Sequence, residues 1–386
     1  MANIDAKKLK EVMKQAEGQY TTFVDKEIPE PKKVVDWQEG KGKNRLLVLY
    51  TGGTLGMEPK EDPESGEEVL KSSLSLEKLL TISDMVTGFK DNTNVLGYHV
   101  SHIDSTEINV KVWDNMAELI QKHYEEIDGV VILHGTDTMA YTASAMAFSL
   151  RNLAIPIVTT GAQHILRKNG TDVIGNLTGA IEVASNRLAG SLLYFNGNIF
   201  NGTRVSKEHD EEVVGFGSPV YGRIGYLGAN GVRFDGRAMK RGTYAPSELV
   251  YDPGFATSVA QIAITPLSRP SQIGQAAMDK GCKALSINSF GPGNVPSWYL
   301  PVIEYLTKEA GFPVFVSSQC AGSGISEGSH YAVGAAVRKA GGVPVMDMGP
   351  ESTAVKLMKV MNRTDKLNVV NREMLTPYAG EITAPR

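Results

Sequence analysis

Two short apolar runs, each followed directly by a turn rich in glycine and threonine, are the features that most constrain the fold of this chain. The first run is Leu46–Tyr50, followed by Thr51–Thr54, and the second is Val130–Leu133, followed by His134–Thr138. Unbroken apolar runs of this length are typical of strands buried on both faces, as in parallel sheets. Because the carboxyl ends of parallel strands meet at one edge of a sheet, we expect both turns at the edge where open α/β proteins bind ligands.

Predicted strands and helices alternate from Arg45 onward. We expect helices over 108–124, 138–153, 172–188, 298–308 and 352–361, and further strands over 155–158, 191–195, 259–264, 284–287, 314–317 and 343–346. Residues 215–256 lack a clear period and are expected to hold short strands and a connection between domains. Alternation at this spacing predicts an α/β protein with mainly parallel sheets.

The first 44 residues differ from the rest and are predicted to form an N-terminal extension. Leu9, Val12, Met13 and Ala16 recur at helical spacing, which predicts a short amphipathic helix. The prolines in Glu27–Pro31 break any helix and predict an extended linker. From sequence, the extension is either docked on the core or mobile.

Composition excludes several functional classes. The net charge of −4 gives no field that favours nucleic acid or an anionic membrane, so neither is expected as a partner. No apolar run approaches the roughly 18 residues that cross a bilayer. Residues 1–44 lack the apolar region of a secretory signal and are too acidic for a transit peptide. The two cysteines make no disulfide framework, so a cytoplasmic location is expected.

The common catalytic motifs are missing from the sequence. The seven histidines show no zinc-ligand spacing, and neither a phosphate loop nor a dinucleotide fingerprint occurs. We therefore expect neither a metal nor a cofactor. The threonine hydroxyls of the two turns then suggest hydroxyl nucleophiles that act on a small substrate.

Each candidate residue also has a purely structural interpretation. Thr51–Thr54 fits a tight connection with a threonine cap, and Asp137 or Thr138 fits a cap for the following helix. In the functional interpretation, the Thr136 hydroxyl is a nucleophile or hands on a proton. Threonine needs a base for this, and Lys207, after a glycine-rich turn, is the candidate. From its surroundings in sequence alone, a solvated surface lysine is the better interpretation of Lys207.

Taken together, the two turns resemble a known family. Tyr50–Met57 and Leu133–Ala145 resemble the two signatures of the L-asparaginase/glutaminase family, closest to the cytoplasmic type I, bacterial-type branch. Other stretches agree with this pattern, namely Asp104–Thr106, Thr160–Gln163, Thr171–Asp172, Gly175–Leu177, Ser289–Asn294, Gln319–Cys320 and Leu375–Pro377. The resemblance runs from about residue 45 to about residue 380.

The resemblance implies a two-domain α/β asparaginase-like fold with mainly parallel sheets flanked by helices. It places a larger N-terminal domain at 45–235 and a smaller C-terminal domain at 257–386. It also implies a homodimer or homotetramer that hydrolyses L-asparagine to L-aspartate and ammonia through an acyl-enzyme.

Carried over position by position, the resemblance implies a role for each site residue. Thr54 matches the primary nucleophile, and Thr136, Asp137 and Lys207 match a second catalytic group. Ser105 and Thr106 match the loop that holds the substrate α-carboxylate, and Asp137 also matches the group that receives the α-ammonium. The backbone amides around Gly53, Gly135 and Ala162 would surround the scissile amide. Asn294 matches a residue that reaches the site from the dimer partner.

One departure from the family pattern leaves alternatives open. The family has a lid tyrosine roughly a dozen residues after the first signature, but here no tyrosine lies between Tyr50 and Tyr98. An acidic stretch, expected to be a solvated loop, stands there instead. Glu67, Glu68 and Tyr20 are the candidate substitutes. The alternatives to an active asparaginase are a catalytically weakened structural or assembly subunit, and an ammonia-supplying subunit of a tRNA-dependent amidotransferase.

Overall fold

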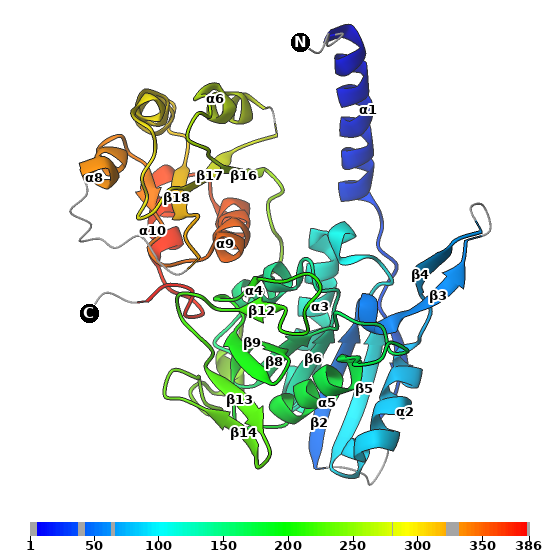
Figure 1. Ribbon diagram of the computed structural model, residues 1–386. Coiled ribbons are helices and arrows are strands. Elements are labelled where there is room, and N and C mark those ends of the chain that lie inside the picture. Colours follow the sequence, from blue (N-terminus) through cyan, green and yellow to red (C-terminus); the bar gives the residue numbers. More distant parts are fainter. Residues whose placement is uncertain (1–5, 38–42, 63–65, 280, 322–331, 384–386) are drawn as a thin grey trace.

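A computed structural model describes residues 6–37, 43–62, 66–279, 281–321 and 332–383 (Figure 1). In these ranges the larger domain is built on a nine-stranded sheet with the order β1-β5-β2-β6-β8-β9-β10-β13-β14. The strands are β1 (Lys32–Val35), β2 (Asn44–Tyr50), β5 (Thr93–His99), β6 (Gly129–Leu133), β8 (Pro156–Thr160), β9 (Gly190–Phe195), β10 (Asn198–Asn201), β13 (Gly225–Gly228) and β14 (Gly231–Phe234).

The centre of this sheet is parallel and its two edges are antiparallel. Strands β5, β2, β6, β8 and β9 run parallel, with Tyr50 aligned to both His99 and Leu133. At one edge β1 pairs antiparallel with β5, and at the other β10, β13 and β14 form an antiparallel meander. The predicted α/β class is confirmed, although the large sheet as a whole is mixed.

Strand β2 is buried on both faces, as its apolar run predicts. Every residue from Leu46 to Tyr50 is fully buried. Leu46 and Val48 pack toward α2 (Leu76–Thr87) and α5 (Val173–Ala184). Leu47 and Leu49 pack on the other face, toward α3 (Val110–His123) and α4 (Met139–Ser149). The alternation of strand side chains thus fills two cores from one run of sequence.

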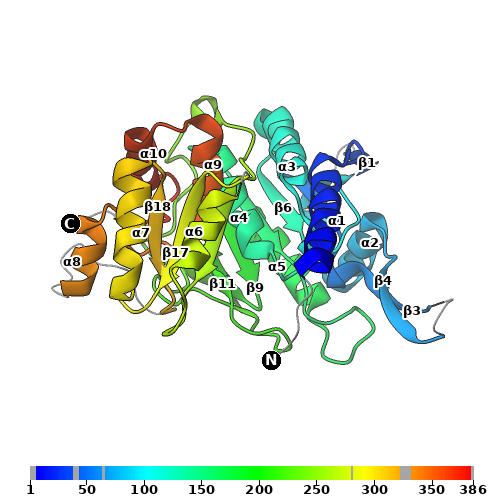
Figure 2. The same ribbon diagram turned by 90° about the horizontal axis from the view of Figure 1, so that it is seen from above.

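The C-terminal domain has a four-stranded parallel sheet in the described residues, ordered β16-β17-β18-β19. Its elements are β16 (Val259–Ala263), α6 (Ser271–Met278), β17 (Ala284–Ser289), α7 (Leu300–Glu304), β18 (Val314–Ser318), α8 (Ala332–Lys339), β19 (Val343–Pro344), α9 (Pro350–Arg363) and α10 (Leu367–Leu375). Seen from above, α9 and α4 lie between the two sheets, where they contact each other (Figure 2). The domains therefore meet through a helix-on-helix contact.

The acidic stretch after the first turn is a hairpin, so the prediction of a solvated loop was wrong. Strands β3 (Met57–Glu61) and β4 (Glu68–Ser72) pair antiparallel, with Met57 opposite Ser72 and Glu61 opposite Glu68. The hairpin projects from the body (Figure 1), so its polar residues can face water while the backbone groups pair. Neither strand has a buried apolar run, and such strands form only because a partner lies beside them.

The N-terminal segment begins with a helix, as predicted, and the predicted linker over Glu27–Pro31 has no regular secondary structure. Helix α1 spans Ala6–Asp25. The segment is docked through β1, whose Lys32 and Lys33 pair with His99 and Tyr98 on β5. Within the described residues, no helix is long and apolar enough to span a bilayer.

Candidate active site

The loops that follow β2, β5 and β6 touch one another at the carboxyl edge of the sheet. A Cβ atom on Gly53 would lie 2.6 Å from the Gly135 nitrogen, and one on Gly135 would lie 2.7 Å from the Ser105 hydroxyl oxygen. Gly53 also has a φ of 92°, which is strained for any other residue. Glycine at these two positions lets the three loops approach closely enough to form one site.

Thr136, Asp137 and Lys207 form a hydrogen-bonded cluster beside these loops. The Lys207 ammonium donates to the Thr136 hydroxyl at 2.9 Å and to Asp137 Oδ1 at 2.7 Å. Lys207 is held there by β11 (Ser206–Lys207), which pairs with β12 (Phe216–Gly217). The side chain is only 19% exposed, so the alternative of a solvated surface lysine does not hold.

Thr54 opens a single helical turn, Thr54–Gly56, directly after the Gly53 contact. Its side chain is half-buried, and within the described residues its hydroxyl makes no hydrogen bond. The Tyr50 side chain packs directly against the backbone of this turn, since a Cβ on Gly56 would lie 1.7 Å from the Tyr50 hydroxyl. Thr54 is thus positioned by backbone packing, with its hydroxyl unengaged.

A buried histidine supports the loop that carries Gly135 and Thr136. His134 is fully buried. Its Nδ1–H donates to the Gly135 carbonyl, and its Nε2 accepts from the Thr142 hydroxyl, which in turn accepts from the Trp113 indole. Burial lowers the pKa of His134 to about 4. The sequence did not predict this role, because the position of a histidine between an apolar run and a turn does not indicate whether its ring is buried and neutral.

His134 makes a specific prediction about stability at low pH. Its pKa is lower in the folded chain than in the unfolded chain, so its contribution to stability is complete above about pH 6.5 and is lost as the pH falls toward about 4. We expect the free energy of unfolding of the native protein to fall by about 3 kcal/mol more than that of His134→Gln between pH 7 and pH 4. If the free energies of unfolding of the two proteins, measured in urea, change equally with pH, the prediction of a neutral, buried histidine is wrong.

The Ser105–Thr106 turn is fixed on both sides. Asp104 Oδ1 accepts from the Thr106 backbone N–H at 2.9 Å and from the Thr106 hydroxyl at 2.8 Å. The Thr138 hydroxyl donates to the Ser105 carbonyl at 2.7 Å. The Thr138 side chain makes no hydrogen bond that caps α4. Its hydroxyl instead joins the loop after β6 to the loop after β5.

The loop carrying Ala162 joins the same edge. A Cβ on Gly161 would lie 2.2 Å from the His134 carbonyl oxygen. The Asp172 carboxylate accepts from the backbone N–H groups of Gln163 and His164, and Asn176 donates to both the Gly161 carbonyl and Asp172. Buried Asp172 and Asn176 thus hold the loop in position.

The remaining candidates lie elsewhere in the single chain. Asn294 follows β17 in the C-terminal domain, where its Oδ1 is buried without a hydrogen-bond partner among the described residues. Tyr20, Glu67 and Glu68 are all exposed. Glu58 is engaged by the Ser73 hydroxyl, which lowers the pKa of its carboxyl. The structure puts none of these four hairpin or α1 residues in hydrogen-bond contact with Thr54.

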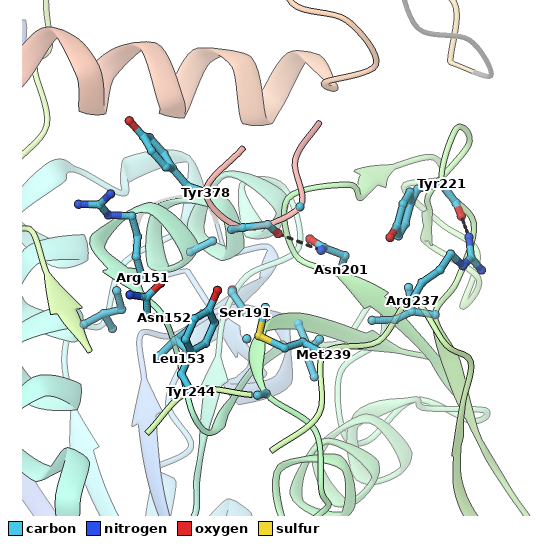
Figure 3. A pocket seen from close by; sticks show the side chains of 18 residues that line it. Arg151, Asn152, Leu153, Ser191, Asn201, Tyr221, Arg237, Met239, Tyr244 and Tyr378 are labelled. Atoms are coloured by element: carbon cyan, nitrogen blue, oxygen red, sulfur yellow. Dashed lines mark hydrogen bonds between the residues drawn. The ribbon is translucent and has the colours of Figure 1, made fainter. Parts of the chain in front are cut away.

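A cavity of about 110 Å³ lies apart from this cluster, near the C-terminal segment (Figure 3). Tyr221, Tyr244 and Tyr378 are among the residues that line it, and none of Thr54, Thr136 or Lys207 does. Within the described ranges, no group of three or more histidine, cysteine, aspartate or glutamate side chains could hold a metal ion.

The two-domain α/β fold thus brings hydroxyl, carboxylate and ammonium groups together near the ends of parallel strands. A family model described as the N-terminal asparaginase domain matches residues 45–240, and one described as the glutaminase/asparaginase C-terminal domain matches residues 258–374. The chain belongs to the asparaginase/glutaminase family and is an asparaginase-family hydrolase.

Relatives of two kinds match over most of the chain. L-asparaginase from Thermococcus kodakarensis is 30% identical, covering 88% of this chain and 99% of the relative, and L-asparaginase 1 from Escherichia coli K12 is 31% identical, covering 88% and 98%. A glutamyl-tRNA(Gln) amidotransferase subunit from Pyrococcus abyssi is 32% identical, covering 89% of this chain and 78% of the relative. The structure of the Thermococcus kodakarensis L-asparaginase superposes with a TM-score of 0.79 over 88% of this chain and 100% of that one, at 30% identity.

Proposed function

We propose that the protein is an L-asparagine amidohydrolase that releases ammonia through an acyl-enzyme on a threonine. The observation that carries the proposal is the Lys207 ammonium, which is hydrogen-bonded to both Thr136 and Asp137 beside the Gly53–Thr54 turn. Amide hydrolysis needs a nucleophile, a proton path to the leaving ammonia, and donors aimed at the developing oxyanion. These loops can supply all three.

The charges of the site suit a free amino acid. Asp137 keeps 56% of its side chain exposed although it binds Lys207, so a carboxylate oxygen is open to the substrate α-ammonium. Ser105 and Thr106 would bind the α-carboxylate. The backbone groups of Gly53, Gly135 and Ala162 would surround the scissile amide while Thr54 attacks it. Water then cleaves the ester on Thr54 to give L-aspartate.

The direct test is ammonia release by the purified protein with L-asparagine, and with L-glutamine, across about pH 6 to 9. Release from L-asparagine that is abolished by Lys207→Met supports the proposal. Release that persists in Lys207→Met would assign the activity to another site or to a contaminant. No release from either amide would reject the proposal.

A second candidate function is ammonia supply to a tRNA-dependent amidotransferase. The amidotransferase relatives favour it, since they match at a similar identity to the L-asparaginases. The net charge of −4 argues against direct contact with tRNA. Ammonia release by this chain alone, without any partner or tRNA, would favour the asparaginase.

A third candidate, a catalytically weakened homologue, is favoured by the unengaged Thr54 hydroxyl and the missing lid tyrosine.

We propose no metal, cofactor, nucleic acid or membrane as a partner. The unpaired cysteines Cys282 and Cys320 suit the reducing cytoplasm, which we propose as the location.

We also propose a homodimer or homotetramer in which Asn294 completes the site of a neighbouring copy. The Asn294 side chain is only partly buried and its Oδ1 makes no hydrogen bond among the described residues, so a rotated side chain has one to offer to a neighbouring copy. We expect Asn294→Ala to raise KM by about tenfold, the effect of one lost hydrogen bond to a charged group. A monomer, identified by light scattering at assay concentration, should be inactive. An unchanged KM would reduce Asn294 to a residue that only shapes its turn.

A further inference from the structure

Helix α1 presents an apolar stripe that the described chain does not cover. The helix has 20 residues and projects from the body of the protein (Figure 1). Leu9, Met13 and Tyr20 on this stripe are 46%, 57% and 51% exposed. A lone helix of this length is marginal in water, and apolar side chains on one stripe favour a partner for it.

The base of the helix is fixed to the core. Lys111 on α3 donates to the backbone carbonyls of Asp25 and Lys26 at the end of α1. Strand β1 follows six residues later and is paired in the sheet. The helix therefore extends from a defined point, with its apolar stripe held away from the domain that carries it.

The spacing of the stripe is that of a two-stranded coiled coil. Leu9, Met13, Ala16, Tyr20 and Phe23 follow one another at intervals of four, three, four and three residues. This is the alternation of a heptad seam, with a mean of 3.5 residues per turn. Val12, which is 52% exposed, flanks this seam on one side and widens the apolar stripe there.

Side-chain size selects the orientation of the pair. In a parallel pair of identical helices, each residue meets its own copy, so a small Ala16 layer would lie next to a bulky Tyr20 layer. In an antiparallel pair centred between Lys14 and Gln15, Leu9 meets Tyr20 and Met13 meets Ala16. Each layer then combines a larger with a smaller side chain, which fills the seam evenly.

Charge selects the same orientation. Lys10 and Glu17 both follow a seam residue directly and flank the seam on the same side. In the antiparallel pair these flanking positions face each other, so Lys10 of one copy lies beside Glu17 of the other, twice over. In a parallel pair the facing positions lie five residues apart in the sequence, so Glu17 would meet Val12 and lose its opposite charge, and only Lys10 would keep one.

We propose that α1 is an assembly arm that pairs antiparallel with α1 of a second copy of this chain. Two helices that meet along about 22 Å bury less than the roughly 1,200 Å² of a small stable interface. The arm therefore reinforces a contact between copies that the cores already make, through a raised effective concentration. This last step rests on the homo-oligomer proposed above, whereas the pairing itself does not depend on the enzymatic reaction.

The test is disulfide formation between two differently tagged chains produced together. One chain carries Leu9→Cys and the other carries Tyr20→Cys. In the antiparallel pair these positions meet, whereas each position lies about 16 Å along the axis from its own copy. We expect a mixed disulfide between the two chains and little product when either variant is alone. A chain with Glu11→Cys, on the opposite face of α1, is the matched control, and the unsubstituted protein accounts for Cys282 and Cys320.

Other binding partners or orientations of α1 predict different crosslinking products. Self-linked products from the single variants would show a parallel pair and overturn the proposal. Absence of the mixed disulfide would also overturn it, because α1 would then fold back on its own core or bind a different molecule. Deletion of residues 1–25 is expected to raise the dissociation constant of the assembly at least about tenfold, as measured by light scattering on dilution. An unchanged dissociation constant would overturn the reinforcing role, whatever the protein does to asparagine.

Discussion

Replacing Thr54 by alanine is expected to lower kcat for L-asparagine by at least about 100-fold, because the attacking hydroxyl is lost. Thr136→Ala and Lys207→Met should cost at least about 100-fold each, the scale of one proton-transfer or oxyanion contribution. The geometry behind this expectation is the pair of hydrogen bonds from Lys207 to Thr136 and Asp137. Steady-state ammonia release is the measurement.

Folding should survive these three changes. Thr54 makes no side-chain hydrogen bond within the described residues, so its removal leaves no buried group unpaired. Thr81→Ala, which removes a hydroxyl from an exposed position on α2, is the matched control and should keep full activity. Near-normal ammonia release by Thr54→Ala would eliminate Thr54 as the nucleophile.

Replacing Glu381 by alanine is expected to reduce the free energy of unfolding by about 3–5 kcal/mol, since it breaks a fully buried ion pair. The Lys356 ammonium lies 2.6 Å from Glu381 Oε1, and both side chains are completely buried. Burial lowers the pKa of Lys356, and its only other hydrogen bonds among the described residues are to the carbonyls of Met374 and Thr376. Without Glu381 the lysine is a buried charge with no counter-ion.

Two variants separate the ion pair from general packing. Glu304→Ala removes an exposed ion pair with Lys308 and should change stability by less than about 1 kcal/mol. The double variant Lys356→Met/Glu381→Gln removes both charges but keeps an acceptor for the Ala379 N–H, and should recover a large part of the loss. Chemical denaturation at one protein concentration measures all three. Equal losses for Glu381→Ala and the double variant would show that the effect is not the unpaired charge.

Strand formation at the centre of the sheet could be predicted because it depends on local sequence. The run Leu46–Tyr50 has no charged side chain to direct toward water, so it forms a strand only where both faces are covered. The helices predicted over 172–188 and 352–361 likewise appear as α5 and α9, because their apolar spacing repeats every 3.6 residues. The α1 helix follows the same rule.

Elements that depend on a distant partner were missed. The strands of the β3–β4 hairpin are polar, and only their mutual pairing makes them strands. Strand β1 is extended because β5 offers it an unpaired edge. The short β11 became a strand through Phe216 and Gly217 of β12, and this pairing decides where Lys207 points.

By itself, the sequence determined the strand-turn units and the glycines that let their loops meet, since these follow from side-chain size and apolar spacing over a few residues. Only the tertiary structure decided that Lys207 reaches Thr136 across 71 positions, that His134 is neutral, and that Lys356 meets Glu381. The physical reason is range. Backbone preference acts between neighbours in the chain, whereas burial and charge interactions depend on which distant segments packing brings together.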